Sequence, residues 1–293
     1  MGFEACHPAV NFIFFAAVLY GSATFRHPVF LAIAYLCAFA YSVKRRGKRA
    51  AIFNLCLLPL VVVFALYYSS YHHFGVTVLR KNFVDNNMTL ESLVYGLVIG
   101  LRFATVCMWL ESMFQVVSSD KVVYLFGKIS PLLSLFLTIL LRLIPRIGLE
   151  ARRINLAQKG IGKGSNQGNI FRRLVNCLRI FSMLITWMIS ALALESDSMR
   201  SRGSLLRGRT AFSIYRFDNR DRAFVIGLFA CITLTVMGVI LGASKMWYNP
   251  RIIWRPLNGI GIVTAIGYLA LCFMPLGLEL WTEYLFSVAR KTA

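Results

Sequence analysis

Acidic side chains are scarce in this sequence. Only 12 of its 293 residues are Asp or Glu, against 32 Lys or Arg, and charged residues make up 15% of the chain. The acids are dispersed, and no Ser or Cys can be matched to a base, so the sequence shows no catalytic constellation. With 58% hydrophobic residues, the composition excludes an ordinary soluble domain and indicates a membrane protein.

Metal-ligating residues are also few and poorly placed. The seven cysteines are scattered singly through apolar runs, without a C-x-x-C pair, and behave as small core hydrophobes. Of the four histidines only His72 and His73 are adjacent, and neighbours in a helix point away from each other. We therefore expect no metal or cofactor on this chain. The N-terminus has no positive region before its first apolar run, so we expect no removable signal peptide.

Long apolar runs predict an all-α, polytopic helical membrane protein. Six spans are expected, at residues 9–25, 28–43, 51–71, 90–117, 223–244 and 256–278, with an interfacial helix closing the chain. Five spans plus a re-entrant segment is the alternative. The net charge of +20 could suggest nucleic acid, but Lys and Arg in loops between spans are explained by their tendency to stay cytoplasmic. No nucleic-acid partner is expected.

The basic run at 44–49 sets the predicted topology. Its five positive charges have no acid beside them in the sequence, which marks this loop as cytoplasmic. Both termini then lie inside, and residues 69–88 lie outside. Arg102, about twelve residues into the fourth span, is costly in lipid, and we expect it to be a structural residue bonded to carbonyls or polar side chains of neighbouring helices.

The middle of the chain differs from its two ends. Residues 120–222 hold 18 of the 32 Lys and Arg, and their apolar runs at 131–147 and 180–194 are short for spans. We expect amphipathic helices at the cytoplasmic membrane surface. Three regions follow: N-terminal transmembrane helices (1–119), a cytoplasmic coupling domain (120–222) and a C-terminal transmembrane region (223–293).

Two helices of the central region have the same design. Pro145 predicts that one helix ends and another begins near Ile144. The basic helix that follows, over 149–164, carries Arg152 and Arg153 and stops at glycines. The second runs from about 170 through Glu195 and Asp197 to Arg200, Ser201, Arg202 and Gly203.

An arginine at such a helix end is well suited to an acidic protein groove, because its planar fork donates to carboxylates and carbonyls. Retention at the anionic inner leaflet is the other explanation for these arginines, at about 1 kcal/mol per charge. The segment 160–165 superficially resembles a phosphate loop. It lacks the first glycine, at Ala157, and has Gly164 where Ser or Thr must follow Lys163.

From about residue 7 to 245 the chain resembles the transmembrane T component of energy-coupling factor transporters, the ABC-class importers of vitamins and metals. The resemblance rests on four segments, at 86–106, 118–162, 191–203 and 208–228. It implies two cytoplasmic coupling helices that end in Ala-Arg-Gly-like motifs and dock on two ABC ATPase subunits, identical or different. ATP and Mg would be bound by those partners.

The second motif corresponds to Ser201, Arg202 and Gly203. The first corresponds to Gly160, Ile161 and Gly162, so Ile161 replaces the arginine, and Lys159 is a possible substitute cation. The resemblance further implies that Arg202 inserts in an ATPase groove, while Arg200, Arg207 and Arg209 hold the helix at the membrane. The apolar helix bodies would contact a membrane-embedded, substrate-binding S component in a prokaryotic cell membrane.

Two other functions stay open at this stage. An integral membrane enzyme with a basic cytoplasmic face, acting on anionic lipids or nucleotides, would need acids or histidines near that face, and all four histidines lie outside 120–222. A self-sufficient permease would need polar residues near the membrane midplane, where Arg102 is the one charge well inside a predicted span. No motif assigns a function to the segment after 245.

Overall fold

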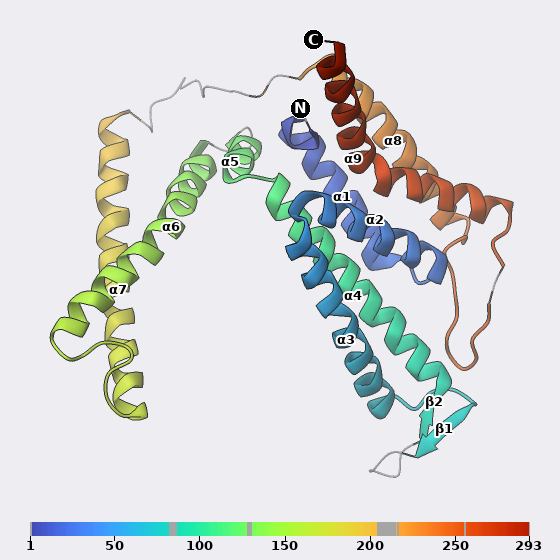
Figure 1. Ribbon diagram of the computed structural model, residues 1–293, viewed down its shortest axis with the longest axis horizontal. Coiled ribbons are helices and arrows are strands. Elements are labelled where there is room, and N and C mark those ends of the chain that lie inside the picture. The colour runs from blue at the N-terminus through green and yellow to red at the C-terminus, as the bar shows by residue number, and fades with distance from the viewer. Residues whose placement is uncertain are drawn as a thin grey trace. The chain divides into compact units, whose positions relative to one another are not determined.

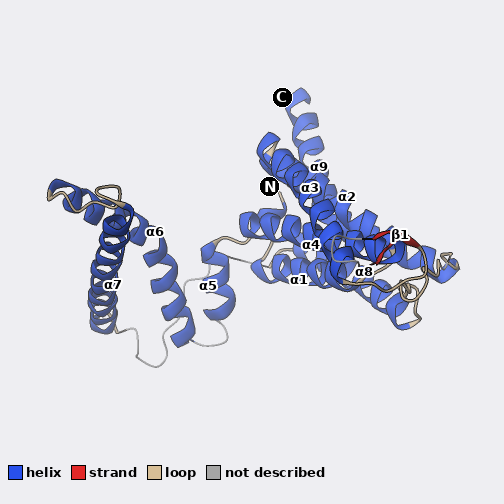
Figure 2. Cartoon of the chain, turned by 90° about the horizontal axis from the view of Figure 1, so that it is seen from below, coloured by secondary structure: helices blue, strands red, loops and turns tan. Residues whose placement is uncertain are grey.

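The computed structural model describes residues 2–81, 87–127, 131–203, 215, 217–254 and 256–292. Helices account for most of this part of the chain (Figures 1 and 2), and the protein is an all-α polytopic membrane protein. The elements are η1 (Phe3–Ala5), α1 (Pro8–Thr24), α2 (Pro28–Arg46), α3 (Lys48–Tyr71), β1 (Val78–Lys81), β2 (Asn87–Thr89), α4 (Leu90–Val116), α5 (Ser119–Gly127), α6 (Pro131–Gly160), α7 (Ile170–Ser201), α8 (Asn219–Ile240) and α9 (Gly259–Thr292).

Six of the described helices are long and apolar enough to cross a bilayer: α2, α3, α4, α7, α8 and the greater part of α9. The sequence also predicts six spans, but the two sets differ. The helix α1 has only 17 residues, whereas α7, expected at the membrane surface, meets the requirements of length and hydropathy. The two sets have the same number of spans, but the predicted set includes α1 where the structure has α7.

The chain divides into two compact units. The first contains residues up to Ser118 and from Tyr215 onward, and the second is Ser119–Ile214. The expected central region extends further, to residue 222. The helix α8 begins at Asn219, so residues 219–222 are the first turn of a helix that belongs to the first unit.

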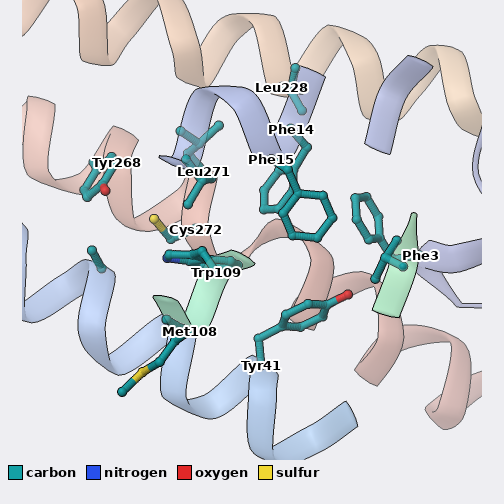
Figure 3. Packing of buried hydrophobic residues seen from close by; sticks show 14 of the residues in the cluster. Phe3, Phe14, Phe15, Tyr41, Met108, Trp109, Leu228, Tyr268, Leu271 and Cys272 are labelled. Carbon is teal, nitrogen blue, oxygen red and sulfur yellow. The ribbon is translucent and has the colours of Figure 1, made fainter. Parts of the chain in front are cut away.

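Aromatic side chains build the core of the first unit. Phe3, Phe14, Phe15 and Trp109 are fully buried, and the Phe14 and Phe15 rings each lie about perpendicular to that of Trp109, with centroids 6.0 and 6.4 Å away. Figure 3 shows these residues with Tyr41, Tyr268 and Cys272 from other helices. Edge-to-face packing of this kind adds to the gain from burial.

Small residues let α3 and α4 approach closely. A Cβ atom added at Gly96 would lie 3.0 Å from the Cα of Ala65, and one at Gly100 would lie 3.0 Å from a methyl group of Val61. Such contacts drive helix association in lipid, where apolar area by itself gives no preference for a protein neighbour. A side chain at position 96 would therefore press against the backbone of the facing helix.

Ion pairs gather at the C-terminal end of α2. Arg45 bonds to Glu4 and, at 3.3 Å, to Glu279, while Lys44 bonds to Glu283 at 2.6 Å. Arg46 bonds to Glu111. The basic run has no acid beside it in the sequence, but the fold brings carboxylates to it from η1, α4 and α9.

The predicted outer segment 69–88 contains β1, and β2 extends one residue beyond it. The two strands form an antiparallel pair. The buried Glu91 of α4 accepts hydrogen bonds from the backbone N–H of Thr77 and, at 2.7 Å, from its hydroxyl. The hydroxyl of Thr89 donates to the carbonyl of Phe74 at 2.5 Å. The described part of this segment is thus bonded to the first turn of α4.

Two helices continue past positions where the sequence predicts a boundary. The predicted break near Ile144 is wrong, because α6 runs through Pro145 without interruption. The proline removes one backbone hydrogen bond, and α6 contacts α7 on both sides of it, through Arg142 and Gln158. The predicted separate closing helix is likewise the second half of α9, which contains Pro275 and bends (Figure 1).

Replacement of Gly96 by Ala should destabilise the first unit, because the added methyl group forces α3 and α4 apart. We expect a cost of about 1–3 kcal/mol, measured as a lower melting temperature of the purified protein in detergent. Gly148→Ala in α6 is the control, since nothing lies within 4 Å of its Cβ position. It should leave the melting temperature unchanged or raise it. Equal behaviour of both variants would contradict the close contact.

Replacement of Arg45 by Gln should cost far more than replacement of Lys44 by Gln. Arg45→Gln leaves the buried Glu279 without its cation, at a cost of about 3–5 kcal/mol. Lys44→Gln removes a pair whose carboxylate is largely exposed, which costs at most about 1 kcal/mol. Melting temperatures of both variants, and of Arg45→Gln combined with Glu279→Gln, test this. The double variant should recover part of the loss.

Candidate functional site

The two predicted coupling helices lie in the second unit, as α6 and α7. Arg142 of α6 bonds to Glu195 of α7 at 3.5 Å, and the amide nitrogen of Gln158 donates to the sulfur of Met183 at 3.6 Å. Because residue numbers rise along α6 as they fall along α7, the helices are antiparallel (Figure 1). We call them the α6–α7 pair.

The α6 end of the pair is closed by a glycine turn. The helix ends at Gly160, and Gly162 has a φ of 75°, a backbone conformation that favours glycine. The N–H of Lys163 donates to the carbonyl of Gln158 at 2.9 Å, which terminates the helix. Ile161 is 68% exposed in this turn, so the first predicted motif presents an apolar side chain. Lys159 is exposed beside it.

The α7 end has the same backbone geometry and a different side chain. The helix ends at Ser201, and Gly203 has a φ of 73° with its N–H bonded to the carbonyl of Arg200 at 2.9 Å. Arg202 is exposed and has no ion pair within the described parts of the chain. The second motif thus presents an unpaired guanidinium group at a helix C-terminus.

These two glycine-closed ends lie far apart. The motif at 160–162 precedes the start of α7, and the motif at 201–203 follows its end. The 32 residues of α7 span about 48 Å at 1.5 Å per residue. A single groove cannot contain both ends, so each end would need its own partner surface.

The supporting residues have separate roles in the structure. Glu195 is bonded to Arg142, which joins the two helices, and Arg153 is bonded to Glu150 within α6 at 3.4 Å. Arg152 and Arg200 are exposed. Arg207 and Arg209 lie outside the described residues.

A group of amide side chains, which the sequence did not single out, shapes the turn between the helices. The amide of Asn176 donates to the carbonyl of Gly164 at 3.2 Å, and Asn155 accepts from the N–H of Ser165 at 3.1 Å. Gln167 accepts from the N–H of Gly164 at 2.9 Å. Asn176 is the only buried residue of α7. A polar amide between apolar neighbours could have indicated this role from the sequence, because a buried amide needs hydrogen-bond partners.

One face of α7 is apolar and uncovered. At 100° per residue, it is centred roughly 170° from the face that holds Asn176, Met183 and Glu195 and contacts α6. Its residues are between 36% and 81% exposed: Phe171, Leu174, Leu178, Phe181, Ile185 and Ile189. We call these six residues the apolar stripe. Apolar surface of this extent marks a contact with protein or lipid.

Arg102 belongs to the first unit, and its expected partners are not found. Its Nε atom is buried without an acceptor, and the side chain has no hydrogen bond or ion pair to any residue that the structure describes. The described residues therefore do not provide the bonds to carbonyls or polar side chains that the sequence led us to expect for Arg102.

Loss of the Asn176 amide should loosen the turn that carries Ile161. In Asn176→Ala, the carbonyls of Gly164 and Gln167 lose their donor. We expect at least about fivefold faster hydrogen exchange for the backbone amides of 161–168, measured by mass spectrometry. Asn166→Ala is the control, because Asn166 is exposed and its side chain makes no hydrogen bond within the described region. Unchanged exchange in Asn176→Ala would contradict this role.

Comparisons with known proteins add no family to these observations. No protein-family model matches the chain, and no curated protein matches it. The resemblance to a transporter component therefore rests on the residues quoted above, and what it implies about partners and substrate belongs to the proposal that follows.

Proposed function

We propose that this chain is the membrane-embedded coupling subunit of an energy-coupling-factor-type ABC importer for a vitamin or a transition metal. The observation that carries the proposal is the α6–α7 pair. These are two long antiparallel helices, each followed two residues later by a glycine of positive φ, with Ile161 exposed at one end and Arg202 at the other. The chain itself would bind no cofactor and catalyse no reaction.

Each end of the pair would contact one of two ATPase subunits. The separation of about 48 Å supports two partners rather than one. Arg202 would donate to carboxylates and carbonyls in its groove, and Ile161 would pack against apolar side chains, with Lys159 beside it. The two contacts would therefore differ in chemistry, which suits a pair of different ATPases as well as two identical ones.

Motion would pass through the pair because the pair is internally connected. The Arg142–Glu195 ion pair joins the helices near one end. At the other end, hydrogen bonds of the side chains of Asn155 and Asn176 join the helices to the turn. A displacement of the ATPases on ATP binding would then rotate or shift both helices together. ATP and Mg would be bound by the ATPases.

The apolar stripe would contact the S component, the separate membrane protein that binds the transported substrate. This assignment gives the stripe a partner of matching chemistry, since spans of a second membrane protein are apolar on their outer surface. Residues 120–222, rich in Lys and Arg, would lie on the cytoplasmic side of a prokaryotic cell membrane.

The proposal predicts that Arg202 is required for ATPase binding. The tagged chain would be co-expressed with candidate ATPases of the same genome and extracted in mild detergent. In Arg202→Glu, ATPase co-purification should fall at least about tenfold, corresponding to about 1.4 kcal/mol, with unchanged membrane levels. Arg200→Glu is the matched control, with the same change of charge two residues earlier, and should retain the ATPase.

Other results would count against the proposal. Full retention of the ATPase by Arg202→Glu would show that docking does not depend on this arginine. If the unaltered chain carries no ATPase, the transporter assignment fails, and the membrane enzyme acting on anionic lipids or nucleotides becomes the preferred hypothesis.

A further inference from the structure

Two arginines of the first unit lie close together, and no described residue forms an ion pair with either. Arg26 is in the turn between α1 and α2, and Arg102 is in α4. Tyr248, in the connection between α8 and α9, lies beside both: its hydroxyl donates to the backbone carbonyl of Arg26 at 2.7 Å. Burial raises the pKa of Tyr248 to about 12, and the positive charges of Arg102 and Arg26 oppose this rise. The two guanidinium groups also repel each other.

This arrangement contrasts with the other end of α2. There Lys44, Arg45 and Arg46 all have carboxylate partners. Near Arg26 and Arg102 the described residues supply no carboxylate, and the Nε atom of Arg102 is buried without an acceptor. A partly buried positive charge is unfavourable unless it is paired, and a second one beside it increases the cost. An anion from outside the chain would remove both costs.

The position of Arg26 indicates where that anion comes from. Pro28, two residues after Arg26, begins a candidate membrane span. Trp247 and Trp254 of the α8–α9 connection are 61% and 59% exposed, and the Trp254 ring lies 5.6 Å from that of His27. Exposed Trp at the end of a span is typical of the boundary between lipid and water. The phosphate groups of lipids lie at this level.

We infer that Arg26 and Arg102 bind the phosphate group of an anionic membrane phospholipid. The guanidinium groups donate to the phosphate oxygens, a geometry in which arginine forms paired hydrogen bonds. The Nε–H of Arg102 then has its acceptor. This site is separate from the α6–α7 pair, and the inference does not depend on the proposed function.

Native mass spectrometry of the purified full-length protein tests the site. The probes are phosphatidylglycerol, diacylglycerol with the same acyl chains, and inorganic phosphate. The unaltered protein should retain one phosphatidylglycerol molecule with higher affinity than any further copies, and diacylglycerol should bind at least about tenfold more weakly. Arg26→Gln combined with Arg102→Gln should weaken retention of phosphatidylglycerol at least about tenfold.

The matched control is Arg80→Gln combined with Arg251→Gln, which removes the same charge from two exposed arginines. It should retain the lipid as the unaltered protein does. Arg26→Gln alone, at an exposed turn position, gives a variant expected to fold normally and should weaken retention at least about threefold.

Three results would overturn the inference. They are equal retention by the double variant, equal binding of diacylglycerol, and failure of the unaltered protein to retain any phospholipid. Displacement of the lipid by millimolar inorganic phosphate would assign the arginines to a free anion instead and would overturn the lipid as its source. If inorganic phosphate does not displace the lipid, the result supports a phospholipid as the bound anion.

Discussion

The bond between Arg45 and Glu279 is the contact on which the arrangement of the first unit depends. Glu279 lies in the second half of α9 and is buried, so its charge requires a cation inside the fold. Arg45 supplies that cation and also bonds to Glu4, which brings the first residues of the chain to the same place. The ring of Phe3 contacts those of Phe14 and Phe15 directly beyond this cluster. The ends of the chain are thus joined to the core through one side chain.

Scarce carboxylates explain why the positive charges of this protein have such different surroundings. Four acids are used at the end of α2, and Glu195 and Glu150 are used within the α6–α7 pair. Arg202 is left exposed at a helix end, while Arg26 and Arg102 are left together near a helix start. Composition counts these residues alike, and only the fold distinguishes a neutralised cation from one that is available to a partner.

Much of the helical architecture could be predicted from the sequence, because length and apolar periodicity are local properties. The ends of α6 and α7 at glycines were also predicted, and Gly162 and Gly203 have the positive φ that explains them. Local rules failed at Pro145, where α6 continues through the proline and contacts α7 on both sides of it. They could not find the partners of Arg45 or the bonds of Asn176, since these join residues that only folding brings together. Whether the ends of the pair bind ATPases stays a prediction.

The turn at the α6 end of the pair is held mainly by uncharged amide side chains, and one charged side chain, Arg173, also donates to the carbonyl of Gly168 at 3.0 Å. Asn155, Asn176 and Gln167 bond to backbone atoms, so neither pH in the usual range nor ionic strength alters these bonds. The two surfaces that the pair presents differ in this respect. Attraction to Arg202 is screened by salt over a Debye length of about 8 Å at physiological ionic strength, whereas salts such as sulfate strengthen apolar contacts like those available to Ile161. A rise in the concentration of such a salt would therefore weaken binding at the Arg202 end of the pair and strengthen binding at the Ile161 end.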